Sequence, residues 1–84
     1  MLPNYPNPFN ARTALRFHLP LQGKIHISIY DLSGKYICTP VDKTLPKGEH
    51  TEIWDAGTVS SGMYIALMRV NGEIVDSRKL LLVR

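Results

Sequence analysis

The feature that most constrains the fold of this chain is an alternation of apolar and polar residues with a period of two. Within residues 12–19, Leu15, Phe17 and Leu19 alternate with polar or charged residues, and residues 24–30 repeat the pattern with three isoleucines. Successive side chains of a β-strand point to opposite faces, so this period predicts strands with one buried face. No stretch shows the spacing of three and four that indicates an amphipathic helix. We therefore expect an all-β fold.

Turn residues divide the chain into short strands. Gly34 in the segment 31–35 can adopt the positive φ of a turn, and Pro40 is expected to end the strand that follows. Asn71-Gly72 between two β-rich runs predicts a hairpin with a type I′ turn. The expected strands lie at residues 12–19, 24–30, 35–39, 41–45, 49–54, 63–70 and 73–83. Seven short strands at this spacing predict an antiparallel β-sandwich.

The first eleven residues differ in composition from the rest of the chain. They hold three of the six prolines and three of the four asparagines. Proline fixes its own φ and favours extended geometry in the residue before it, so this segment is expected to be stiff and extended. We expect Tyr5 and Phe9 to pack on the edge of the domain. A length of 84 residues allows one hydrophobic core, and we divide the chain into a linker at residues 1–11 and a sandwich at residues 12–84.

Charge and hydropathy argue against several classes of partner. The net charge is +3, but the basic residues are dispersed and the seven aromatic residues do not interleave with them. Nucleic-acid binding is therefore not expected. No apolar run approaches the length of about 20 residues that crosses a bilayer, and no secretory signal opens the chain. We expect export information to lie elsewhere in a parent chain or at the C-terminus.

The polar residues do not favour catalysis or metal binding. No serine lies in a G-x-S-x-G elbow, and the glycines are dispersed at turns instead of forming a phosphate loop. His18 and His26 could face each other across the first two strands, but two histidines without a third ligand make a weak site. Cys38 has no partner for an internal disulfide and is expected to pack as a small strand residue. We expect no enzyme activity, no cofactor and no metal.

Two aromatic residues have structural interpretations. Trp54 is expected to be the largest core side chain of the sandwich. The alternative is a sugar-stacking platform, for which only Tyr30, Tyr36 and Tyr64 are candidates. Tyr64 stands near the start of a long strand, where its phenol can hydrogen-bond back to the backbone in the manner of a tyrosine corner.

Three blocks of the sequence resemble the type A C-terminal sorting domain of the type IX (Por) secretion system. The opening block is Asn4-Tyr5-Pro6-Asn7-Pro8-Phe9-Asn10, then Thr13, then Leu15-Arg16-Phe17-His18-Leu19-Pro20. The middle block is Ile29-Tyr30-Asp31-Leu32-Ser33-Gly34-Lys35, then Lys47-Gly48-Glu49-His50 and Trp54-Asp55. The last block is Ser61-Gly62-Met63-Tyr64-Ile65 and Lys79-Leu80-Leu81-Leu82. The chain departs from the family at Ala11, where another proline is usual, in a shortened loop before Ser61, and at Ile53, where a polar residue is common. The middle pattern is also similar to the immunoglobulin-like domain of flagellar hook-capping proteins.

The resemblance implies an immunoglobulin-like β-sandwich of about seven antiparallel strands that targets a parent protein and catalyses nothing. The implied partners are the outer-membrane translocon, a sortase-like peptidase and a parent catalytic or adhesin domain joined through residues 1–11. The parent would pass through the periplasm to the cell surface or the medium. The peptidase could remove the domain and attach the parent to surface lipopolysaccharide.

The family's pattern places recognition on the last hairpin, at Gly62, Tyr64, Lys79, Leu80, Leu81, Leu82, Val83 and Arg84. An apolar edge strand that ends in cations would offer unpaired backbone groups for strand addition by a receptor. Leu80 and Leu82 could also be core residues of that strand, and a dimer through it stays open. The alternative function is an accessory carbohydrate-binding or spacer module, which would tolerate residues added after Arg84, whereas a sorting signal would not.

Overall fold

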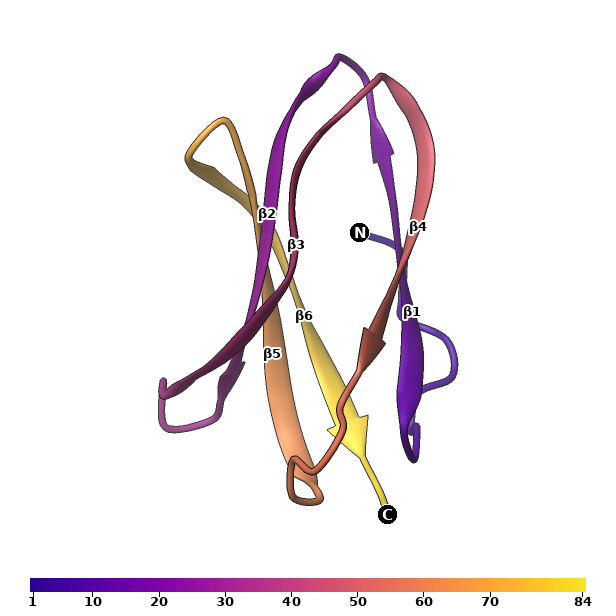
Figure 1. Cartoon of the computed structure of the whole chain (residues 1–84), viewed down its shortest axis with the longest axis vertical. Helices are drawn as coiled ribbons and strands as arrows, with labels where there is room; N and C mark the ends of the chain where they lie inside the picture. Colours follow the sequence, from indigo (N-terminus) through magenta and orange to yellow (C-terminus); the bar gives the residue numbers. More distant parts are fainter.

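A computed structural model of residues 1–84 forms a β-sandwich of two facing sheets (Figure 1). Its six antiparallel strands are β1 (Arg12–Leu19), β2 (Gly23–Asp31), β3 (Tyr36–Leu45), β4 (Gly48–Asp55), β5 (Gly62–Val70) and β6 (Glu73–Leu82). β1 pairs with β4 in one sheet, and the other sheet has the order β3-β2-β5-β6. These pairs correspond to strands B–E and C′–C–F–G of an immunoglobulin-like sandwich. The chain contains no helix that could span a membrane.

The prediction of seven strands was wrong by one, because the chain continues through Pro40 as a single strand. β3 is an edge strand, so a residue without an N–H removes no hydrogen bond to a second neighbour. The pairing of β3 with β2 shifts in register between Ile27 and Ile29, opposite Val41 and Cys38. This irregularity accommodates the proline within the strand.

The core lies between the two sheets. The alternating residues of β1 and β2 supply much of it, and all of them are buried: Leu15, Phe17, Leu19, Ile25, Ile27 and Ile29. Trp54 is only 3% exposed. Its ring centroid lies 5.5 Å from that of Phe9 and 6.0 Å from that of Tyr64. The prediction that Trp54 anchors the core is confirmed.

The turn between β5 and β6 has the predicted geometry. Asn71 and Gly72 have φ values of 52° and 87°, as a type I′ turn requires. Gly34, between β2 and β3, has a φ of 88°. The turn residues therefore explain how these neighbouring strands connect.

Residues 1–11 cover one side of the sandwich, where β1 and β6 would otherwise have free edges. The backbones of Tyr5 and Ala14 exchange hydrogen bonds of 3.2 and 2.7 Å on β1. Further along, Phe9 forms a parallel bridge with Leu82 of β6. The Phe9 ring is 3% exposed and the Tyr5 ring 71% exposed, so the expected packing is confirmed for Phe9 and wrong for Tyr5. That residues 1–11 also link the domain to a preceding one stays a prediction.

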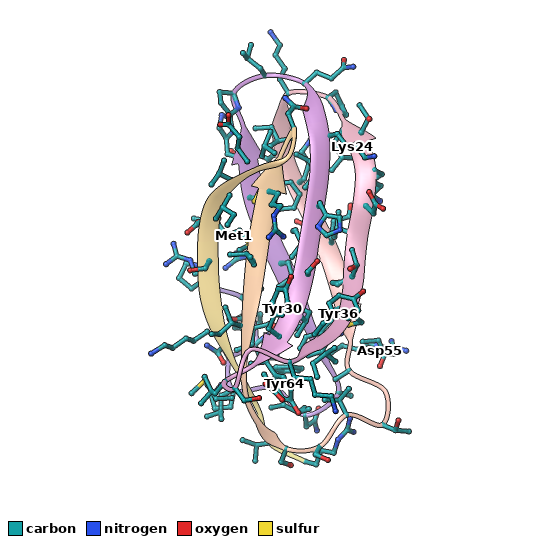
Figure 2. All side chains as sticks on the ribbon, turned by 90° about the vertical axis from the view of Figure 1, so that its left-hand side faces the viewer. Met1, Lys24, Tyr30, Tyr36, Asp55 and Tyr64 are labelled. Atoms are coloured by element: carbon teal, nitrogen blue, oxygen red, sulfur yellow. The ribbon has the colours of Figure 1, made fainter.

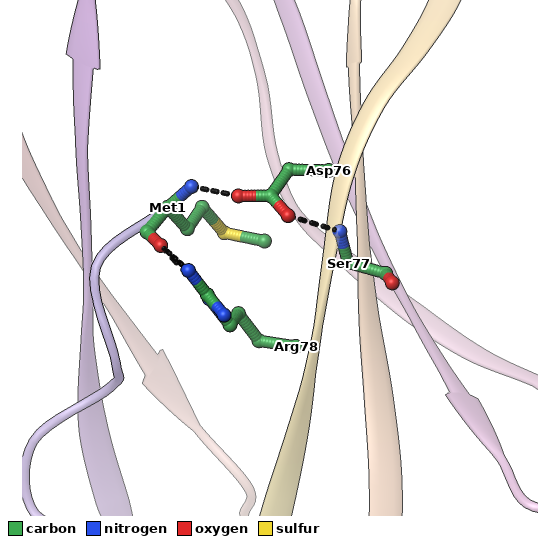
Figure 3. A network of polar contacts seen from close by, with 4 residues as sticks. All are labelled: Met1, Asp76, Ser77 and Arg78. Atoms are coloured by element: carbon green, nitrogen blue, oxygen red, sulfur yellow. Dashed lines mark hydrogen bonds and ion pairs between the residues drawn. The ribbon is translucent and has the colours of Figure 1, made fainter.

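Met1, the first residue of this segment, contacts β6 (Figure 3). The Met1 amino group forms an ion pair with Asp76, and the Met1 carbonyl accepts a hydrogen bond from Arg78 Nε at 2.8 Å. Asp76 also accepts a hydrogen bond of 2.8 Å from the backbone of Ser77. Residues 1–11 therefore touch both sheets along the length of this side.

Candidate functional site

The eight residues predicted for recognition lie together at one end of the last hairpin. In the antiparallel register of β5 and β6, Gly62 stands opposite Leu82 and Tyr64 stands opposite Leu80. This end is remote from the Asn71-Gly72 turn and close to the C-terminus of the chain (Figure 1). The structure thus brings the predicted residues into one region.

Three of the eight residues face the core. Leu80 and Leu82 are fully buried and Tyr64 is 6% exposed. The Tyr64 hydroxyl donates a hydrogen bond of 2.5 Å to the carbonyl oxygen of Ser60, so the predicted tyrosine-corner contact is confirmed. These side chains can influence a partner only through the shape and stability of the hairpin.

Gly62 begins β5 and is half-buried. A Cβ atom at this position would meet only a ring carbon of Tyr64, at 3.9 Å. Gly62 therefore presents backbone, without a side chain, to anything that approaches the end of the hairpin.

The other four residues are accessible to different degrees. Lys79 is exposed and forms no ion pair within the chain, and Leu81 beside it is half-buried. Val83 is 50% exposed. Arg84 folds back onto the loop between β4 and β5, where its Nε donates to the carbonyl of Val59 at 2.6 Å. A partner could touch these four side chains without unfolding the domain.

The outer edge of this end of β6 is covered, which corrects the expectation of unpaired backbone groups. Phe9 N donates to the carbonyl of Leu81 at 3.0 Å, and Val83 N donates to the carbonyl of Phe9 at 2.8 Å. The carboxamide of Asn7 accepts from Leu81 N at 3.0 Å and donates to the carbonyl of Lys79 at 3.5 Å. Strand addition at residues 79–83 would therefore have to displace residues 7–9.

Sequence reasoning missed the roles of the asparagines in the opening motif. Asn4 is 5% exposed and donates to Thr13 Oγ1 at 2.8 Å and to the carbonyl of Pro6 at 3.1 Å. The side-chain carboxamide of Asn7 forms the two hydrogen bonds on the edge of β6 that a peptide group of a neighbouring strand would form. The available signal was the clustering of carboxamides with prolines beside an aromatic anchor, which we interpreted as a linker.

The tyrosines on the outer face do not form a flat platform. The rings of Tyr30 and Tyr36 lie 5.9 Å apart at an interplanar angle of 69°, in an edge-to-face arrangement. Trp54 is buried and cannot join them. The coplanar exposed aromatics on which the sugar-binding alternative depends are not brought together.

The two histidines that could have faced each other across the first two strands lie in different sheets. His18 Nδ1 on β1 is 2.9 Å from Glu49 Oε1, and His26 Nδ1 on β2 is 3.2 Å from Ser28 Oγ. No group of three or more His, Cys, Asp or Glu side chains is positioned to hold a metal ion. Cys38 is half-buried, and this burial raises the pKa of its thiol and disfavours the reactive thiolate.

Comparison of the sequence with known protein families gives a match over nearly the whole chain. The family described as the secretion system C-terminal sorting domain matches residues 4–83. No significant match to a curated protein or to a solved structure was found. The match spans both the opening motif and the last hairpin, which the fold places side by side. The chain therefore belongs to the family of secretion system C-terminal sorting domains.

Proposed function

We propose that the secretion machinery recognises and binds the end of the last hairpin of this sorting domain. As a member of its family, the chain is a non-catalytic C-terminal sorting domain for type IX secretion, which takes proteins across the outer membrane to the cell surface or the medium. The observation that carries the finer proposal is the gathering of all eight candidate residues at this end.

The eight residues divide into a supporting group and a contacting group. Tyr64, Leu80 and Leu82 hold the hairpin on the core. The contacting group consists of the accessible residues Lys79, Leu81, Val83 and Arg84, with Gly62 leaving space beside them. Two of these are cations, so a partner surface with carboxylates would complement them.

The proposed partners act in sequence. The outer-membrane translocon receives the domain from the periplasm, and a sortase-like peptidase then separates it from a parent catalytic or adhesin domain that precedes residues 1–11. Residues 7–9 lie along β6, so a parent domain that precedes residues 1–11 would join the sorting domain on the side of the last hairpin. A dimer through the last strand would have to displace the same residues from β6.

The test is export of a periplasmic reporter that carries residues 1–84 at its C-terminus, in a host with a working type IX system. Deletion of residues 79–84 is unsuitable, because it removes the core residues Leu80 and Leu82. The variant is instead V83S/R84A, which changes two exposed residues at the end of the hairpin.

The matched control is L21S/K47A, which removes an exposed leucine and an exposed lysine in the β1–β2 and β3–β4 connections, at the opposite end of the sandwich. We expect V83S/R84A to accumulate in the periplasm while the control is exported like the parent fusion. Equal export of the two double variants would contradict recognition at the hairpin end.

A further inference from the structure

We propose that the partner docks on the outer face of the four-stranded sheet, at a surface formed by Tyr30, Ile65, Leu67, Arg69 and Lys79, here called the outer β5 patch. The partner inferred is a protein surface that presents apolar side chains flanked by carboxylates. This inference rests on the proposed function and extends the contact from Lys79, at the end of the hairpin, along the outer face of β5 and across to β2.

The sequence of β5 is typical of a strand that is covered on both faces. Tyr64, Ala66 and Met68 point into the core and are buried. The alternate positions Ile65 and Leu67 are also apolar, although they face away from the core. An antiparallel strand with one face in water normally has polar residues there, whereas a strand covered on both faces is apolar throughout.

Pairing brings residues from three strands together on this face. Ile65 stands opposite Tyr30 of β2 on one side and opposite Lys79 of β6 on the other. Figure 2 views this face, with Tyr30 labelled on it. A hollow of about 350 Å³ lies here, lined by Tyr30, Asp31, Leu32, Gly34, Ile65, Leu67 and Arg69. Leu32 at its rim is 64% exposed, so an apolar side chain that entered the hollow would have an apolar contact there.

The charges around the patch favour an acidic partner. Neither Arg69 nor Lys79 forms an ion pair within the chain. The acid at the rim, Asp31, accepts hydrogen bonds from its own turn, at 2.7 Å from Ser33 Oγ and 2.9 Å from Lys35 N. Two free cations beside an apolar centre would be complemented by carboxylates around an apolar contact.

The covered edge of β6 also favours an approach of the partner from the outer face of the sheet. Residues 7–9 occupy the outward backbone groups of residues 79–83. A partner that reads Lys79 and Leu81 without displacing that segment must therefore approach from the outer face of the sheet.

The test compares export of the reporter fused to residues 1–84 with export of two patch variants, L67S and K79E. The matched controls are I53S, which changes a residue 57% exposed on the other sheet, and K47E, which reverses an exposed lysine between β3 and β4. K79R retains the charge and should be exported normally. We expect export of both patch variants to fall roughly tenfold, the change that loss of one good interface contact produces.

The outcomes separate this inference from the proposed function. Normal export of L67S and K79E, alongside the parent fusion, would overturn the outer β5 patch and leave the sorting function standing. Failure of the parent fusion to leave the periplasm would overturn the sorting function itself. Thermal unfolding of each purified domain shows whether it is folded. Lys79 is exposed and unpaired, so K79E keeps the test valid even if L67S is destabilised.

Discussion

At the scale of single residues, several side chains fix the course of the backbone through hydrogen bonds. Tyr64 links the start of β5 to Ser60, Asn4 holds Thr13 and Pro6, and Asn7 covers the edge of β6. Local sequence predicted the Tyr64 contact, because the hydroxyl reaches a backbone group only four residues away. It could not predict the Asn7 contact, because the partners of that carboxamide lie more than seventy positions along the chain.

Asp31 supports a prediction on pH at this scale. Its carboxylate accepts hydrogen bonds from Ser33 Oγ and from the backbone N–H groups of Lys35 and Ser33, which lower its pKa. A carboxyl group with a lowered pKa stabilises the fold above its unfolded pKa of about 3.9, and this contribution is lost as the pH falls through the folded pKa.

The D31N variant should therefore be less stable than the parent domain at pH 6, and the difference should shrink as the pH falls toward 2. Urea unfolding at several pH values measures this, with D42N at an exposed acid on β3 as the control. A difference between D31N and the parent that stays constant across this range would contradict the assigned role of Asp31.

At the scale of elements, the strands followed from the alternation of residues and the segment 1–11 did not. Period-two patterns and turn residues together indicated β1, β2, β4, β5 and β6 to within one residue at each end. They could not show that Pro40 would be tolerated, since that depends on β3 lying at a sheet edge. They also could not show that residues 1–11 pair with both β1 and β6, because that pairing depends on tertiary structure.

Phe9 tests whether this segment is part of the folded domain. Its ring is 3% exposed and packs against Trp54. F9A should lower the free energy of unfolding by about 3–5 kcal/mol, as for other buried phenylalanines. The control Y5A, at a ring that is 71% exposed, should change it by less than about 0.5 kcal/mol. Chemical denaturation of the purified domain measures both, and equal stabilities for F9A and Y5A would contradict a structural role for the segment.

At the scale of the whole molecule, the two sides of the sandwich differ. Residues 1–11 cover the side of β1 and β6, whereas the side of β3 and β4 is spanned by a surface ion pair of 2.9 Å between Lys43 and Glu52. Residues 1–11 and the last hairpin consequently lie on the same side of the molecule. This arrangement suits a module whose C-terminal end is read while a parent protein extends from its N-terminal end.

The candidate site was predictable in part. The resemblance placed the candidate recognition residues on the last hairpin, and the fold gathers them at one end. The division between the buried residues Leu80 and Leu82 and the accessible Lys79 and Leu81 follows from strand alternation. The covered edge depends on pairing with residues 7–9, which no local pattern encodes. That pairing moves the proposed contact from the edge of β6 to the outer face of the sheet.

The most direct test of the central claim is the location of a reporter fused to residues 1–84 in two matched hosts, one with a working type IX system and one without its translocon. A sorting domain should place the reporter on the surface or in the medium of the first host and leave it in the periplasm of the second. The same location in both hosts, with the domain shown to be folded, would contradict the account.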